Sequence, residues 1–195
     1  MSDLSPMEEL SPFQEKLINY LEDAHALEQH VKVALTSMIS SAPDVPELQD
    51  PLNHHKEETE QHIKRLEERL EAYGKSPSTI KDAGMMFGAT GLGMLDKLRK
   101  DNAGKVARDG YTAEHLEIAS YELLERVAMR AGDEATAEVA RQNRADEVAM
   151  AKKIEESWDL ALDMSFEQEG LHGAPPMGEP GSMAGAKPPE PGTAQ

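Results

Sequence analysis

The stretch PLNHHKEETEQHIKRLEERLEAY, residues 51–73, decides the fold class of the chain. It has no glycine, and no proline after its first residue, and the helix-favouring residues Glu, Lys, Arg, Gln and Leu dominate it. Its apolar residues recur at steps of three and four, the spacing of a helix with one face in a core. Counted from just before the stretch, this face comprises Leu48, Leu52, Ile63, Leu66, Leu70 and Tyr73.

The middle of this face is polar. Its residues there are His55, Glu58, Thr59 and His62. A carboxylate buried without a partner costs several kcal/mol. A metal ion is one partner that offsets this cost, and carboxylates on other helices at the same level would complete its site.

Three further segments have the same helical spacing. The Ser11-Pro12 start, with Glu15 near the capping-box position, predicts a helix over residues 11–39. Residues 111–132 and 133–166 predict two more, with Asp133 as the N-cap of the last. The sequence therefore predicts an all-α fold, an antiparallel four-helix bundle.

The segment between the second and third helices, residues 74–109, is rich in glycine. It predicts a long crossover connection with short helices over 78–87 and 91–100, which makes the third helix parallel to the second. Residues 1–10 are expected to be a flexible lead-in to a bundle over 11–168. The tail, 169–195, is rich in Gly, Pro and Ala and is expected to be disordered.

The composition excludes several function classes. The chain has no cysteine, hence no disulfide, thiolate metal site or cysteine nucleophile. Its net charge of -17 disfavours nucleic acids and anionic membranes as partners, because both are polyanions. The N-terminus lacks the pattern of a signal peptide, and no apolar run is long enough for a membrane span. We expect a cytoplasmic protein.

One glutamate lies on the apolar face of each predicted helix: Glu28, Glu58, Glu117 and Glu147. Helices joined by a short turn are antiparallel neighbours, and a rise of about 1.5 Å per residue brings each pair of glutamates to a similar depth. Carboxylates with a few nitrogen donors suit divalent iron or manganese. The alternative is that these carboxylates pair with Lys and Arg, or face water.

Bundle proteins with carboxylate-bridged metals take a Glu from two helices and a Glu-x-x-His from the other two. Here Gln61 and Met150 stand where those histidines would be, so nitrogen would come from His55 or His62, one turn either side of Glu58. Glu114, one turn before Glu117, adds a carboxylate. The candidates in order are the four glutamates above, then His55 and Glu114, then Gln61 and His62. Tyr121 is interpreted as a core residue.

Four short runs carry a resemblance to a known family: residues 26–29 (ALEQ), residues 55–67, residues 114–121 (EHLEIASY) and residues 145–150 (ADEVAM). In this order they resemble bacterial ferritin-like proteins of the YciE/YciF type, over residues 11–168. The resemblance implies a ferritin-like four-helix bundle, a di-iron or di-manganese centre, a dimer and a link to bacterial stress responses.

These observations lead to three functional hypotheses. The first is a ferritin-like stress-response protein that binds two divalent iron or manganese ions, forms a homodimer and oxidises Fe(II) as a ferroxidase. The second is a non-catalytic bundle with an interaction or structural role. The third, an acid–base hydrolase, has little support, because no motif pairs a nucleophile with a base.

Overall fold

The computed structural model describes residues 9–41, 46–75 and 103–172, and its regular elements in these ranges are all helices. They are α1 (Pro12–Ser41), α2 (Pro46–Ala72), α4 (Ala103–Ala131), α5 (Glu134–Glu155) and α6 (Trp158–Gln168). The predicted all-α fold is confirmed. None of the described helices is both long and apolar enough to cross a membrane.

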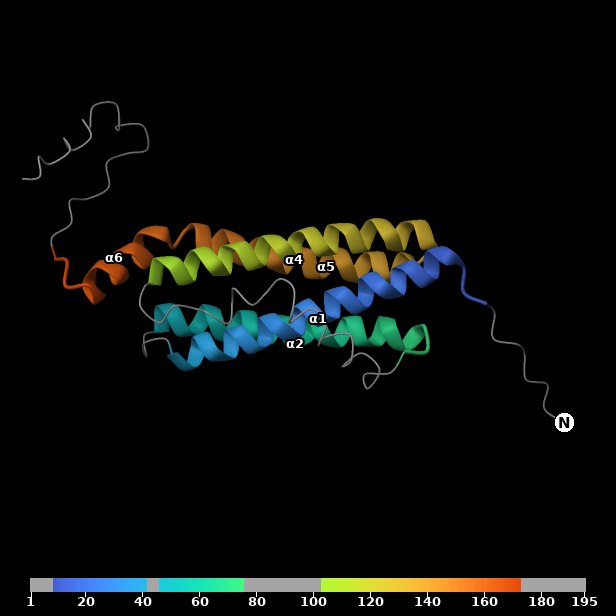
Figure 1. Ribbon diagram of the computed structural model, residues 1–195, viewed down its shortest axis with the longest axis horizontal. Helices are drawn as coiled ribbons and strands as arrows, with labels where there is room; N and C mark the ends of the chain where they lie inside the picture. The colour runs from blue at the N-terminus through green and yellow to red at the C-terminus, as the bar shows by residue number, and fades with distance from the viewer. Residues whose placement is uncertain (1–8, 42–45, 76–102, 173–195) are drawn as a thin grey trace, which may run out of the picture.

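The four long helices form a bundle with α6 at one end (Figure 1). Helices α1 and α2 are antiparallel, as are α4 and α5, while α2 and α4 run in the same direction, as a crossover between them requires (Figure 1). The predicted crossover and its short helices, over 78–87 and 91–100, lie outside the described residues, as do most of the lead-in and the tail.

The helix starts follow the capping rules. At the start of α1 the partner of Ser11 is Gln14, not Glu15: the Ser11 hydroxyl accepts from the Gln14 N–H (3.3 Å), and the Gln14 side chain accepts from the Ser11 N–H (2.8 Å). Asp133 caps α5, as predicted, and accepts from the Thr136 N–H at 3.0 Å. The turn before it needs a positive φ, which Gly132 supplies (φ 76°).

Two predicted helix boundaries are wrong. Helix α4 begins at Ala103 rather than near Tyr111 and runs through Gly104 and Gly110. Glycine weakens a helix by only about 1 kcal/mol, which tertiary contacts can offset. Here the hydroxyl of Ser165, on α6, accepts from the N–H of Gly104 at 2.8 Å and so satisfies one of the free donors of the first turn.

The predicted fourth helix is in fact two, because α5 ends at Glu155 and α6 starts at Trp158. The Ser157 hydroxyl donates to the carbonyl of Ile154 at 2.8 Å, a local bond that competes with helix continuation. The Trp158 ring packs edge-on against Tyr111 of α4, with 5.4 Å between ring centroids. The break thus lets α6 cover the early start of α4.

The interior of the bundle is layered. A large apolar cluster occupies one end and a smaller one, built on α1, the other. The large cluster contains Leu17, Ile18, Leu21, Ala24, Leu66, Leu70, Tyr121, Leu124, Ala128, Ala137 and Ala140. The small one contains Leu27, Val31 and Leu35. Several buried residues that belong to neither cluster are charged or polar, and six of them form the candidate site.

Candidate metal centre

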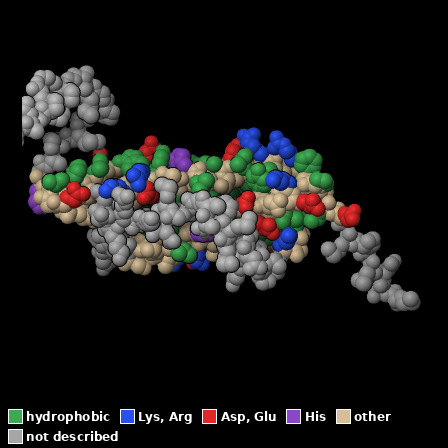
Figure 2. Space-filling model, viewed as in Figure 1, with side chains coloured by type: hydrophobic (Ala, Val, Ile, Leu, Met, Phe, Trp, Pro, Cys, Tyr) green, Lys and Arg blue, Asp and Glu red, His purple; other side chains and the backbone are tan. Residues whose placement is uncertain are grey.

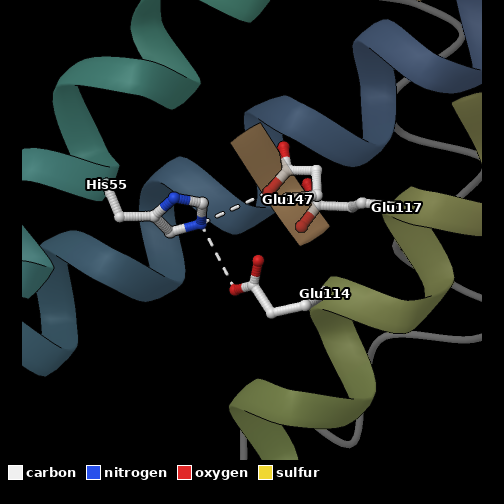
Figure 3. Close-up of side chains that lie close together, drawn as sticks. All are labelled: His55, Glu114, Glu117 and Glu147. Carbon is white, nitrogen blue, oxygen red and sulfur yellow. Dashed lines mark ion pairs between the residues drawn. The ribbon is translucent and has the colours of Figure 1, made fainter. Parts of the chain in front are cut away.

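Two groups of side chains in the bundle each have ligand atoms within 4.8 Å of one another. The first group consists of His55 from α2, Glu114 and Glu117 from α4, and Glu147 from α5 (Figure 3). The second consists of Glu28 from α1, His62 from α2, and Glu147 again. All four long helices contribute, and Glu147 joins the two groups.

The helical spacing explains why these residues meet. His55 and His62 are seven residues apart, so α2 presents them on one face two turns from each other. Glu114 and Glu117 are three residues apart, so α4 presents two neighbouring carboxylates to the first group. Each histidine of α2 therefore serves a different group.

The distances between these ligand atoms are close to those expected around an ion, and two of the four fall within that range. Nε2 of His55 lies 3.2 Å from Glu114 Oε1 and 3.6 Å from Glu147 Oε2. Nδ1 of His62 lies 2.9 Å from Glu147 Oε1 and 3.2 Å from Glu28 Oε1. Two donors about 2.1 Å from one ion, at tetrahedral or octahedral angles, are about 3.0–3.4 Å apart.

All six residues are buried, with 0% to 3% of their surface exposed. Both oxygens of Glu117, and Oε2 of both Glu28 and Glu114, have no hydrogen-bond partner among the described residues. No described ion pair joins a Lys or Arg to any of the six. Buried polar atoms are normally paired, so this donor set fits a cation.

Burial and mutual repulsion raise the pKa values of these carboxyl groups. The pKa of Glu117 lies well above its usual value, because the side chain is desolvated and lies near the charges of Glu28, Glu147 and Glu114. Burial also raises the pKa of Glu28 and of Glu147, although contacts with His62 partly oppose the shift. Without a cation in the site, these carboxyl groups therefore keep their protons more readily than an exposed glutamate does.

The pKa values of the two histidines are also raised, but by the neighbouring carboxylates and against the effect of burial. Burial lowers the pKa of His55, but the hydrogen bond and charge of Glu114, with further carboxylates, outweigh it and raise the pKa to about 9. Burial likewise lowers the pKa of His62, but Glu147 and Glu28 outweigh it and raise the pKa to about 10. A bound cation would displace these protons, because a ligating imidazole is neutral.

Tyr121 is a core residue, as interpreted from the sequence, and it also contacts the second group. It is buried in the large apolar cluster, and its hydroxyl donates to Glu28 Oε1. The same hydroxyl accepts from Asn143 Nδ2 at 2.9 Å. These two hydrogen bonds fix the position of the Glu28 carboxylate on the side that faces the apolar cluster.

Six of the eight sequence candidates come together, and two do not. Glu58 belongs to neither group: its side chain is 22% exposed and contacts the ring nitrogens of His54 (3.2 Å) and His55 (3.4 Å). Gln61 is exposed. Both lie to one side of the α2 face that carries His55, Thr59 and His62, because three residues advance a helix by less than one turn.

Sequence reasoning missed Asp146, which contacts His62. Its Oδ2 lies 3.0 Å from Nε2 of His62 and 3.5 Å from Nη1 of Arg65. The only sequence signal for it is its position directly before Glu147. The contact connects α2 and α5, which are also joined by Arg65 to Asn143 (2.8 Å) and by Arg69 and Tyr73 to Asp133.

The fold and the site together define a class: a four-helix bundle with a buried carboxylate–histidine cluster. The chain belongs to the family described as "Domain of unknown function (DUF892)", which it matches over residues 12–164. This confirms the predicted family.

Solved structures of bacterial proteins share the fold. A protein from Xanthomonas campestris is 27% identical, with 80% of this chain and 98% of that chain covered and a TM-score of 0.65. YcfI from Rhodopseudomonas palustris, for which a structural role has been suggested, is 25% identical, with 76% and 96% covered and a TM-score of 0.56. The stress protein YciF of E. coli is 19% identical, with 84% and 99% covered and a TM-score of 0.57, a likeness of fold alone.

Proposed function

We propose that this protein binds two divalent metal ions, iron or manganese, inside the bundle and acts in the bacterial stress response. The observation that carries the proposal is the pair of buried ligand groups that share Glu147. The first position would be held by His55, Glu114, Glu117 and Glu147, and the second by Glu28, His62 and Glu147. The four carboxylates would neutralise two divalent ions once both histidines are uncharged.

The two positions differ in their ligands. The first offers four donor residues and the second three, with the hydroxyl of Tyr121 beside Glu28. We expect the first position to bind its ion more tightly, and the second to keep room for an exogenous ligand, as catalytic sites do. Redox-active ions held in pairs would supply electron transfer, and the reaction we propose is the oxidation of Fe(II) to Fe(III) by molecular oxygen, which would accept the electrons and take up protons from water. The chain itself binds the ions and excludes bulk water.

A non-catalytic role is the second candidate, and the raised histidine pKa values favour it. Protonated His55 and His62 pair with Glu114, Glu147 and Glu28, so a metal-free polar layer has internal ion pairs. Glu117 is the residue that this reading leaves without a partner.

We also propose a cytoplasmic homodimer. Leu116 and Leu123, seven residues apart on α4, are both exposed, and Figure 2 shows further apolar side chains along the α4–α5 side of the molecule. Surfaces of this kind are typical of contacts between subunits. Analytical ultracentrifugation of the Leu123→Glu variant tests this; a wild type that sediments as a monomer contradicts it.

Metal titration tests the proposed function. Calorimetry with Mn(II), and with Fe(II) without oxygen, is expected to give two ions per chain, and Glu147→Ala is expected to weaken both steps. The control is Glu57→Ala, because Glu57 is an exposed neighbour of the site. Aerobic Fe(II) titration followed by absorbance then tests oxidation. Binding no stronger than in the Glu147→Ala variant would favour the non-catalytic bundle.

A further inference from the structure

We propose that Glu58 and Asp146 are positioning residues, which hold the two histidines so that opposite ring nitrogens face the metal positions. This inference rests on the proposed function. It gives a role to Glu58, one of the two candidates outside both ligand groups, and to Asp146, the carboxylate that the sequence did not reveal.

Glu58 lies behind the ring of His55. Nε2 of His55 faces Glu114 and Glu147, whereas Nδ1 faces Glu58 Oε2 at 3.4 Å. Because Glu58 follows His55 by three residues, this support is local to α2. With Nδ1–H directed at Glu58, the lone pair of Nε2 points into the first group.

Asp146 lies behind the ring of His62, which is turned the other way. Nδ1 of His62 faces Glu28 and Glu147, whereas Nε2 lies 3.0 Å from Asp146 Oδ2. This support comes from α5, and Arg65 in turn contacts Asp146. With Nε2–H directed at Asp146, the lone pair of Nδ1 points into the second group.

The burial of these residues separates the two roles. The site residues are at most 3% exposed, whereas the side chains of Glu58 and Asp146 are 22% and 36% exposed. A carboxylate at the edge of the site can accept a hydrogen bond from the imidazole N–H and remain partly hydrated. Such partners fix the ring orientation of a metal-ligating histidine. Removing such a partner typically lowers metal affinity about 10- to 100-fold.

The first experiment is ¹⁵N NMR of the histidine rings in the full-length protein, titrated with Zn(II) as a diamagnetic probe. We expect Zn(II) to coordinate Nε2 of His55 and Nδ1 of His62, with the other nitrogen of each ring protonated. Coordination of both histidines through the same nitrogen would overturn the inference, while the proposed metal site would stand. If wild type binds no Zn(II), both proposals fall.

The second experiment measures Zn(II) affinity in Glu58→Ala and Asp146→Ala. We expect a loss of about 10- to 100-fold at one binding step in each variant, with a partial recovery in Glu58→Gln and Asp146→Asn, which keep an acceptor oxygen. The matched controls are Glu57→Ala and Asp163→Ala, which are exposed on α2 and α6. Variants that bind Zn(II) like these controls would refute a positioning role.

Discussion

Two layers of the same bundle, two helical turns apart, have opposite chemistry. Seven residues from Glu28, Glu117 and Glu147, along their own helices, lie Leu21, Leu124 and Ala140. The glutamates belong to the candidate metal centre, whereas the other three belong to the large apolar cluster. Identical helix geometry therefore builds both layers, and only the side chains decide which layer is apolar and which could hold a cation.

The difference shows how a buried polar layer can persist. Burial of apolar side chains stabilises a fold by about 25 cal/mol per Å², whereas unpartnered carboxylates oppose folding. In the metal-free protein, the apolar cluster must therefore supply the stability that holds the helices in register. Changes in the two layers should therefore affect stability and metal binding in opposite ways.

The largest expected effect is in the apolar layer. Leu66→Ala should lower the free energy of unfolding by about 2–5 kcal/mol, because Leu66 is fully buried and its removal leaves a cavity. Urea denaturation with and without Mn(II) measures this, and the loss should be the same in both. The control is Val33→Ala, on α1, because Val33 is exposed and lies outside the proposed dimer contact; an equally large loss there would contradict the assignment of the core.

The next effect is in the polar layer and has the opposite sign. Glu117→Leu should raise the free energy of unfolding of the metal-free protein by about 1–4 kcal/mol, because it removes a buried carboxylate without a partner. The same variant should lose the stabilisation that Mn(II) gives wild type. Urea denaturation in the presence of a chelator, and then of Mn(II), separates the two effects. A destabilised metal-free variant would show that Glu117 is satisfied in the folded chain.

Asp133, which caps α5 beside the apolar layer, gives a pH-dependent effect on stability. Burial raises the pKa of Asp133, but hydrogen bonds from Thr136, Tyr73 and Arg69 outweigh it and lower the pKa. As the pH falls, Asp133 is therefore protonated in the unfolded state before it is protonated in the folded state. The stability that its carboxylate contributes is fully present above its usual pKa, and it is lost as the pH falls through the lowered pKa of the folded state.

Asp133→Ala should thus lower the free energy of unfolding by about 0.5–2 kcal/mol at pH 7, with a smaller difference from wild type at pH 3. Urea denaturation at both pH values measures this, and Mn(II) affinity should not change. A difference that grows on acidification would contradict the sign of the pKa shift.

The smallest expected effect separates stability from metal binding within one helix, α4. Gly110→Ala should raise the free energy of unfolding by about 0.5–1 kcal/mol, because alanine favours the helix and its Cβ would lie 3.6 Å from Ile154 Cδ1, an ordinary contact. Glu114, one turn further along α4, should keep its metal affinity. Thermal unfolding and calorimetry on one preparation measure both, and a weakened Mn(II) affinity would show that packing at Gly110 is coupled to the site one turn away.

The sequence predicted those features that depend on one helix at a time. The step of three and four identified Glu28, Glu117 and Glu147 on buried faces, and these side chains meet in the structure. It did not separate Glu58 from His62, because both lie on the same side of α2 to within a fraction of a turn. Asp146 contacts His62 of a neighbouring helix, and the spacing of residues along α5 alone carries no information about that contact.

The predictions of the helix ends were wrong for a related reason. Gly104 and Gly110 have weak helix propensity, but contacts with α6 support the first turns of α4. Ser157 interrupts a segment that propensity alone would continue as one helix. In both cases a contact between elements, or a side chain bonded to its own backbone, outweighs the local preference.

Glu147 is shared by ligand groups from the other three long helices: α1 and α4 each reach it through one group, and α2 reaches it through both. An ion bound there would act as a crosslink between the first helical pair and the second, which forms only when both pairs have assembled. A link that closes so long a stretch of chain slows its opening, and with it attack by proteases. The lifetime of this protein would then follow the supply of metal in the cell, even if no reaction took place at the site.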